Sequence, residues 1–336
     1  MKDFLLNIRY LLSYLLVASI MKFIKIMPRK FVISTAGAIA GLVYKFKFIH
    51  RLIQANLAAA LPELSLAERE DIGRASMRNV VINMIEFIWL SGNPKRIRQI
   101  YQLPEEVCAQ LKQFVADEVR IIFVNPHLGS WEASGVMAPF YAGVKMCAIA
   151  KPLRNPYLNR LLNQGNREKT GDLEIIFTKG AMRAATKALH RGLGLGTLID
   201  QNTRGRDGGE FVNFFGLPVA CSKAPATMMR YCRQNNLKSV IVYGTSIREE
   251  DGKIRARMEL LPKPFEKYEN DEAVIQDIMN ISEKYIRRYP EQYLWLYKRF
   301  LYMPKDIDPE LKKRYPYYAK TISDTFYSKK RFAVGK

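Results

Sequence analysis

Cysteine and histidine are both scarce in this chain of 336 residues. The four cysteines lie far apart, and no two of them form a C-x-x-C pair. This spacing argues against a disulfide scaffold and a zinc site, and it is typical of proteins of the reducing cytosol. Only three histidines are present and no H-E-x-x-H sequence occurs, so we expect neither a metal nor a cofactor.

Motifs of several common functional classes are missing as well. There is no G-x-S-x-G sequence, so the nucleophile turn of an ordinary serine hydrolase is absent. The glycines of Gly192-Leu-Gly-Leu-Gly196 follow an expected helix and precede a strand, which is the wrong order for a phosphate-binding loop. No zinc-finger, RNA-recognition or basic-zipper pattern occurs, so we expect no nucleic-acid partner.

Positive charge, in contrast, is abundant. The 53 lysine and arginine residues outnumber the 32 acidic ones and give a formal net charge of +21. Such an excess predicts an anionic partner, and without nucleic-acid motifs it favours an anionic membrane surface, an acidic protein or a phosphorylated lipid. Apolar residues make up 48% of the chain, which indicates a globular protein.

The first fifty residues contain two apolar stretches. The charge-free part of the first, residues 10–21, is short for a spanning helix, which needs roughly 20 residues. The second, residues 31–44, contains Gly37 and Gly41 at a spacing that lets helices pack closely. Basic residues bracket both stretches, as in segments that dock to a cytoplasmic leaflet. We therefore expect residues 1–50 to anchor the chain to a membrane, with a buried helical hairpin as the alternative.

Residues 51–100 are predicted to be helical, with a capping box at Ser65-Leu-Ala-Glu68. Strands and helices then alternate, which predicts an α/β domain with a mixed β-sheet flanked by helices. The expected strands lie near 119–125, 145–150, 173–177, 195–199, 238–247 and 254–261, and the expected helices near 130–140, 156–168, 180–191, 222–235 and 271–288.

One stretch, residues 119–132, combines an apolar strand, a loop and the start of a helix. Asn125-Pro126 ends the strand, Gly129 allows a turn, and Ser130 is suited to cap the helix. His127 therefore lies on the loop and Glu132 in the first helical turn, where the two side chains can converge. We expect Glu132 to accept the Nδ1–H of His127 and leave Nε2 free as a base. A structural histidine beside a helix N-terminus is the alternative.

Three polar residues, His127, Lys151 and Asp200, each follow the end of a predicted strand. In α/β folds such positions line the functional site. A base without a protein nucleophile implies that the substrate supplies the attacking group. The hydroxyl of a membrane-bound acceptor attacking an activated acyl group fits this pattern, with an arginine, a lysine or backbone N–H groups stabilising the oxyanion.

Four ordered blocks resemble a known family. The stretch Asn125-Pro-His127-Leu-Gly-Ser-Trp-Glu132 is similar to the H-x₄-[D/E] motif of glycerolipid acyltransferases and, more narrowly, to its form in the lipid A biosynthesis lauroyl/myristoyl acyltransferases. The other three blocks are Lys151-Pro-Leu-Arg-Asn-Pro156, Asp200-Gln201 with Phe211-Val-Asn-Phe-Phe-Gly216, and residues 287–299. The similarity extends from about residue 5 to residue 305.

The resemblance implies an acyltransferase of the bacterial inner membrane, acting at its cytoplasmic face. The implied donor is an acyl carrier protein thioester, and the implied acceptor is a hydroxyl of an anionic lipid A precursor. His127 would be the base and Glu132 its partner. The implied substrate-binding residues are Lys151, Arg154, Asn155, Arg167, Asp200, Gln201, Phe215 and Gly216. An acidic carrier protein and an anionic lipid would both account for the net charge.

The chain departs from the family pattern at Pro126, Ser130 and Tyr297. These departures leave another bacterial lipid, such as a lysophospholipid, an ornithine lipid or a glycolipid, as an alternative acceptor. A basic membrane-binding protein without activity is a further alternative. Together with the anchoring segment 1–50, we expect an acyltransferase domain at residues 51–305 and a basic C-terminal extension at residues 306–336.

Overall fold

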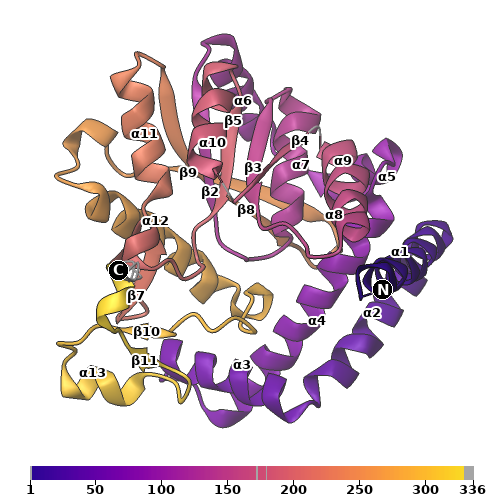
Figure 1. Ribbon diagram of the computed structural model, residues 1–336, viewed down its shortest axis with the longest axis horizontal. Coiled ribbons are helices and arrows are strands. Elements are labelled where there is room, and N and C mark those ends of the chain that lie inside the picture. The colour runs from indigo at the N-terminus through magenta and orange to yellow at the C-terminus, as the bar shows by residue number, and fades with distance from the viewer. Residues whose placement is uncertain (1, 172, 179, 329–336) are drawn as a thin grey trace.

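A mixed β-sheet forms the centre of the computed structural model, which describes residues 2–171, 173–178 and 180–328 (Figure 1). Within these residues the sheet has seven strands in the order β1-β9-β8-β2-β5-β3-β4. They are β1 (Tyr101–Gln102), β2 (Arg120–Asn125), β3 (Met146–Ala150), β4 (Leu173–Phe177), β5 (Gly194–Leu198), β8 (Ser239–Arg248) and β9 (Ile254–Leu260). Among the described strands of this sheet, β8 and β9 pair antiparallel and all other neighbours pair parallel. The α/β fold with a mixed sheet is therefore confirmed.

Helices cover both faces of the sheet, as the near-continuous apolar sequence of β2 requires. Successive side chains of a strand point to opposite faces. Ile121 accordingly packs in one cluster with Leu111 and Ala138, whereas Ile122 packs in another with Leu189 and Met228. The helices of the domain are α6 (Glu105–Ala116), α7 (Trp131–Ala142), α8 (Pro156–Leu162), α9 (Lys169–Gly171), α10 (Ala181–His190), α11 (Ala224–Gln234) and α12 (Asp271–Arg288).

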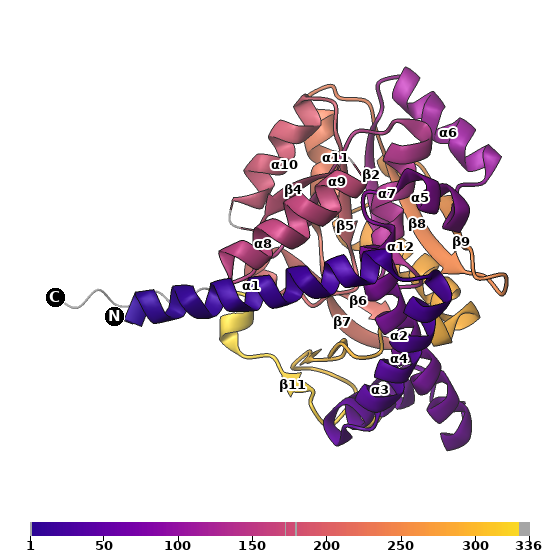
Figure 2. The same ribbon diagram turned by 90° about the vertical axis from the view of Figure 1, so that its right-hand side faces the viewer.

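The N-terminal part is helical, as expected. It consists of α1 (Lys2–Ile26), α2 (Arg29–Tyr44), α3 (Lys47–Ala60), α4 (Leu66–Leu90) and α5 (Pro94–Ile100). Among the described residues α1 is the one straight helix long and apolar enough to cross a membrane, and only 6% of its most apolar window is buried. Figure 2 shows its N-terminal end extending beyond the other helices and strands. The predicted capping box is present at the start of α4.

The segment between Asp200 and α11 contains two strands that the sequence did not indicate. They are β6 (Gly209–Phe214) and β7 (Leu217–Ser222), which form an antiparallel hairpin outside the main sheet. The hairpin buries Phe214, Leu217 and Val219 against the core.

The described part of the C-terminal extension packs against this domain. Arg314 donates to the carbonyl oxygens of Ala59, at 3.0 Å, and Phe215, at 2.8 Å, while Phe326 is buried. The extension contains α13 (Pro309–Arg314) and β11 (Lys320–Thr321), and β11 pairs with β10 (Tyr302–Met303). Residues 329–336 lie outside the described residues.

Candidate active site

The loop between β2 and α7 carries His127 and leaves no room for a side chain at Gly129. Gly129 has a φ of +61°, and a Cβ there would lie 2.1 Å from the carbonyl oxygen of Ser246 in β8. That carbonyl accepts a hydrogen bond from the backbone N–H of Ser130 at 2.7 Å. Glycine is therefore required by both conformation and space. The Ser130 side chain makes no cap hydrogen bond, so the helix start is confirmed but the predicted cap is not.

His127 is buried and held by Asp200. Its Nδ1 lies 2.7 Å from one carboxylate oxygen, and its backbone N–H donates to the other at 2.9 Å. The expectation that Glu132 accepts the Nδ1–H is therefore wrong. The cause is long-range: β2 and β5 are adjacent parallel strands, so the residues that follow them meet at one edge of the sheet.

The charged forms of His127 and Asp200 stabilise each other. Burial by itself would lower the pKa of His127, but the charge of Asp200, the hydrogen bond to it and the charge of Glu132 raise this pKa overall. Burial by itself would raise the pKa of Asp200, but His127 and, more weakly, Arg299 lower it overall. The geometry thus favours an ionised Asp200 that accepts the Nδ1–H and leaves Nε2 unprotonated.

Glu132 has a different partner, Arg167. The guanidinium of Arg167 donates through Nε to one oxygen of Glu132 at 2.9 Å and through Nη2 to the other. A third donor of this guanidinium contacts Asn163 at 2.9 Å. The hydrogen bonds from Arg167 to Glu132 are the largest cause that raises the pKa of Arg167. Such two-point pairing fixes the plane of an arginine as well as its position.

A cavity of about 370 Å³ opens beside the Glu132–Arg167 pair, between the sheet and α7. This is within the range of roughly 300–1,000 Å³ found for small-molecule sites. Its wall is mainly apolar and includes several small residues, which leave room under α7: Gly135, Ala148, Gly196 and Gly244. Its polar lining includes Glu132, Lys151, Arg167 and Gln201. Gln201 also connects the cavity with the imidazole, because its side-chain nitrogen lies 3.3 Å from Nε2 of His127.

Four of the predicted substrate-binding residues lie away from this cavity. Asn155 caps α8 and donates to the Tyr10 carbonyl and the Ser13 hydroxyl of α1, each at 2.9 Å, so it connects these helices. Arg154 is exposed on the loop before α8. Phe215 and Gly216 form the turn between β6 and β7, where Phe215 is buried against Trp295. The structure therefore brings together His127, Glu132, Lys151, Arg167, Asp200 and Gln201.

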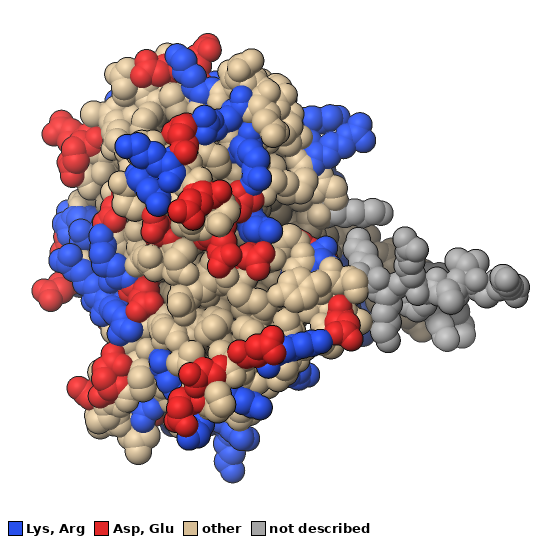
Figure 3. Space-filling view, turned by 90° about the vertical axis from the view of Figure 1, so that its left-hand side faces the viewer, with Lys and Arg blue, Asp and Glu red and all other residues tan. Residues whose placement is uncertain are grey.

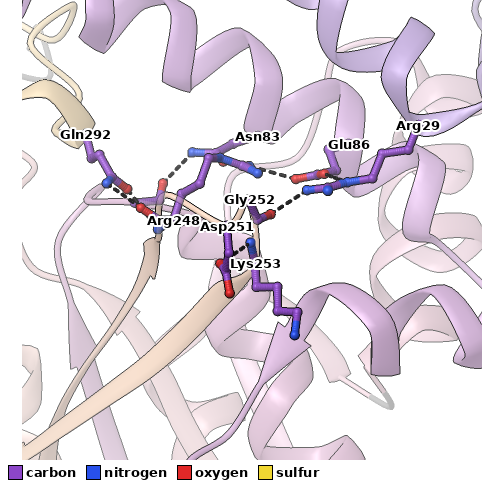
Figure 4. Close-up of polar contacts among 9 residues, drawn as sticks. Arg29, Asn83, Glu86, Arg248, Asp251, Gly252, Lys253 and Gln292 are labelled. Carbon is purple, nitrogen blue, oxygen red and sulfur yellow. Dashed lines mark hydrogen bonds and ion pairs between the residues drawn. The ribbon is translucent and has the colours of Figure 1, made fainter.

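Sequence reasoning missed a buried polar network that supports the His127 loop (Figure 4). Glu86 of α4 is only 1% exposed and pairs with Arg29 of α2 and Arg248 of β8, each at 2.7 Å. Arg248 also donates to Asn83, whose amide donates to the Gly129 carbonyl at 2.5 Å. The network therefore connects α2 and α4 with the loop that carries His127.

A second support comes from the segment after α12. The Gln292 carbonyl accepts from the backbone N–H of Gly129 at 3.0 Å, and the backbone N–H of Leu294 donates to the His127 carbonyl at 3.0 Å. Asn79 of α4 also donates to the Gln292 carbonyl. A signal for this support was present in the sequence, because Asn79, Asn83 and Glu86 recur at helical spacing on the apolar face of α4.

The comparisons with known proteins agree with this architecture. Residues 1–302 match the model of a family described as bacterial lipid A biosynthesis acyltransferase. The chain belongs to this family. It is therefore an acyltransferase, and the resemblance found in the sequence is confirmed.

The sequence identity to individual relatives is low. The chain is 27% identical to the lipid A biosynthesis myristoyltransferase of Escherichia coli K12 over 315 residues, which cover 91% of this chain and 92% of that protein. It is 24% identical to a lipid A biosynthesis acyltransferase of Haemophilus influenzae, with coverage of 76% and 78%. It is 25% identical to the palmitoleoyltransferase of lipid A biosynthesis in Escherichia coli K12, with coverage of 74% and 78%.

Proposed function

We propose that this lipid A biosynthesis acyltransferase transfers a fatty acyl chain from an acyl carrier protein thioester to a hydroxyl of a lipid A precursor. The observation that carries the proposal is the position of His127. Its Nδ1 is bound to Asp200, and its Nε2 lies 3.3 Å from the side-chain nitrogen of Gln201, which lines a largely apolar cavity. A base beside an apolar cavity suits a reaction between a hydroxyl and a fatty acyl thioester.

The reaction proceeds by direct transfer, without an acyl-enzyme. Nε2 of His127 takes the proton of the acceptor hydroxyl while its oxygen attacks the thioester carbonyl carbon. Asp200 stabilises the imidazolium that forms. When the tetrahedral intermediate collapses, the carbon–sulfur bond breaks, and the imidazolium returns the proton to the leaving thiolate. His127 thus ends the cycle in its neutral form.

Arg167 is the group that we assign to the oxyanion of the intermediate. It lines the cavity, carries a permanent positive charge, and is oriented by Glu132. In this proposal Glu132 positions Arg167 and contributes to the field at His127 without contacting the imidazole. Lys151, at the same cavity, adds a second cation for the phosphate groups of the donor or the acceptor.

The proposed location is the cytoplasmic face of the bacterial inner membrane. Large apolar side chains are exposed along α1, including Leu12, Leu16 and Phe23. Exposed apolar side chains over such a length suit a lipid environment. The excess of basic residues suits both an anionic leaflet and an acidic carrier protein.

The test is a mass-spectrometric assay with membranes, a tetra-acylated lipid A precursor and a panel of acyl carrier protein thioesters. A single added acyl mass with wild type, lost in His127→Ala, is the expected result. If no thioester adds mass to lipid A, the proposed acceptor is wrong. The same assay with lysophospholipid, ornithine lipid and glycolipid acceptors then identifies the lipid that is acylated.

A further inference from the structure

A second and larger cavity lies between α2 and α4, with a volume of about 720 Å³. We call it the α2–α4 groove. It is lined by Gly37, Ala38, Gly41, Leu42, Tyr44, Lys45, Lys47, His50, Glu70, Arg74 and Arg78. Residues four apart share one face of a helix, so Glu70, Arg74 and Arg78 project on one side of α4. Asn79 and Asn83, which support the His127 loop, project on the other side.

The groove is open because two glycines lie on the groove side of α2. Glycines at this spacing often allow two helix backbones to touch. Here a Cβ at Gly41 would meet nothing within 4 Å, and a Cβ at Gly37 would meet only the guanidinium of Arg78, 3.3 Å from its Nε. Close helix packing therefore does not account for Gly41, and the space beside it is open to a ligand.

The charge of the groove is unbalanced. Its one acidic residue, Glu70, already pairs with His50 at 2.8 Å and Arg74 at 3.0 Å. In the part of the chain that the structure describes, Lys45, Lys47 and Arg78 form no ion pair. Ammonium and guanidinium groups in this number suit a phosphate.

The face that includes α11 and α12 offers a contrast. Figure 3 shows basic and acidic side chains interspersed there. Several of these basic groups are paired, as Arg233 is with Glu266 and Arg287 with Glu283. In the groove, by contrast, several cations surround a single acidic residue, Glu70.

Apolar side chains border the groove. Leu42, Phe46 and Phe48 are 64%, 54% and 69% exposed, next to Lys45 and Lys47. This part of the chain is the bend of 89° between α2 and α3. Aromatic and basic residues that alternate in this way are typical of the boundary between lipid tails and headgroups. A ligand here would meet cations with one end and apolar groups with the other.

We propose that the α2–α4 groove binds one anionic phospholipid of the membrane. Its phosphate contacts Lys45, Lys47 and Arg78, and its tails lie against Leu42 and Phe46. This site is separate from the proposed reaction, because α4 lies between the groove and the His127 loop. A bound lipid would join α2 to α4 on the side opposite the buried Glu86 network.

The test measures lipid retention by native mass spectrometry on the full-length protein in a neutral detergent, titrated with phosphatidylglycerol or phosphatidylcholine. Wild type is expected to retain one phosphatidylglycerol in preference to phosphatidylcholine. The double variant Lys45→Gln/Arg78→Gln should bind phosphatidylglycerol at least about tenfold more weakly, since two charge-assisted contacts are lost. Gly41→Leu, which fills the groove without changing charge, should weaken retention similarly, with thermal melting confirming that it folds.

The matched control is Lys112→Gln/Lys187→Gln, which removes the same charge from exposed positions on α6 and α10. Retention equal to wild type in this control supports a specific groove. An equal loss in the control, or equal retention of the two lipids by wild type, would overturn the proposal. None of these readouts depends on acyl transfer, so a failure of the proposed lipid A reaction would not be mistaken for a failure of the groove.

Discussion

The two ion pairs of the candidate active site, His127–Asp200 and Arg167–Glu132, differ in their exposure to solvent. The side chains of His127 and Asp200 are 9% and 3% exposed, whereas those of Arg167 and Glu132 are 34% and 21% exposed. A charge pair out of water interacts strongly and controls protonation, while a pair in contact with water is screened and can exchange partners. This difference is the basis of our proposal that the inner pair, His127 and Asp200, handles the proton and the outer pair, Arg167 and Glu132, contacts the substrate.

Removal of the base should have the largest effect. We expect His127→Ala to lower the rate of acyl transfer by at least about 10²–10⁴-fold, because no other group would take the hydroxyl proton. The measurement is kcat with a saturating acceptor, and circular dichroism checks that the variant is folded. Unchanged turnover would show that neither pair acts as proposed.

Asp200→Asn tests the inner pair directly. The amide cannot balance the imidazolium charge and does not enforce Nδ1–H, so kcat should fall by about 10²–10⁴-fold, as in related base–carboxylate pairs. A loss smaller than that of Glu132→Gln would reverse the roles that we assign to the two carboxylates.

The same variant should also shift the pH profile. In the proposed mechanism the neutral form of His127 is the active one, so kcat/KM should rise as pH increases through the pKa of this residue. Asp200 raises that pKa in wild type. The rising limb of the residual activity should therefore move to lower pH in Asp200→Asn. A limb that moved to higher pH, or did not move, would contradict the assignment of His127 as the base.

Glu132→Gln tests the outer pair. Arg167 keeps its charge but loses charge-assisted hydrogen bonds, which should cost about 10-fold to 100-fold in kcat/KM. The rising limb should remain much closer to that of wild type than in Asp200→Asn, because no hydrogen bond to the imidazole is removed. Asp207→Asn, a change at an exposed ion pair, is the matched control. A pH shift as large as that of Asp200→Asn would make Glu132 the controlling carboxylate.

Asn83→Ala should have the smallest effect on the reaction. It removes the donor to the Gly129 carbonyl and leaves that buried group unpaired, at a cost of about 1–3 kcal/mol in stability. Thermal melting measures this loss, and kcat should fall only modestly. A melting temperature equal to that of wild type would show that Gln292 and Ser246 hold the loop without Asn83.

Much of this protein was predictable from local sequence. The strand, loop and first turn of α7 follow from an apolar run, a proline and a glycine, and the capping box at Ser65 and Glu68 follows from residue types three apart. Strand–helix alternation predicted the α/β class. The two strands β6 and β7 were missed because their glycine-rich surroundings resemble a loop, and their pairing depends on packing against the core.

The residues of the candidate site were also predictable, but their partners were not. Sequence alone identified His127, Glu132, Arg167 and Asp200, because residue type and the order of motifs are local properties. Tertiary structure decided that Asp200, 73 residues away, binds His127 while Glu132 binds Arg167. The physical reason is strand order: β2 and β5 become neighbours only when the sheet forms, and that pairing sets which side chains meet at its edge.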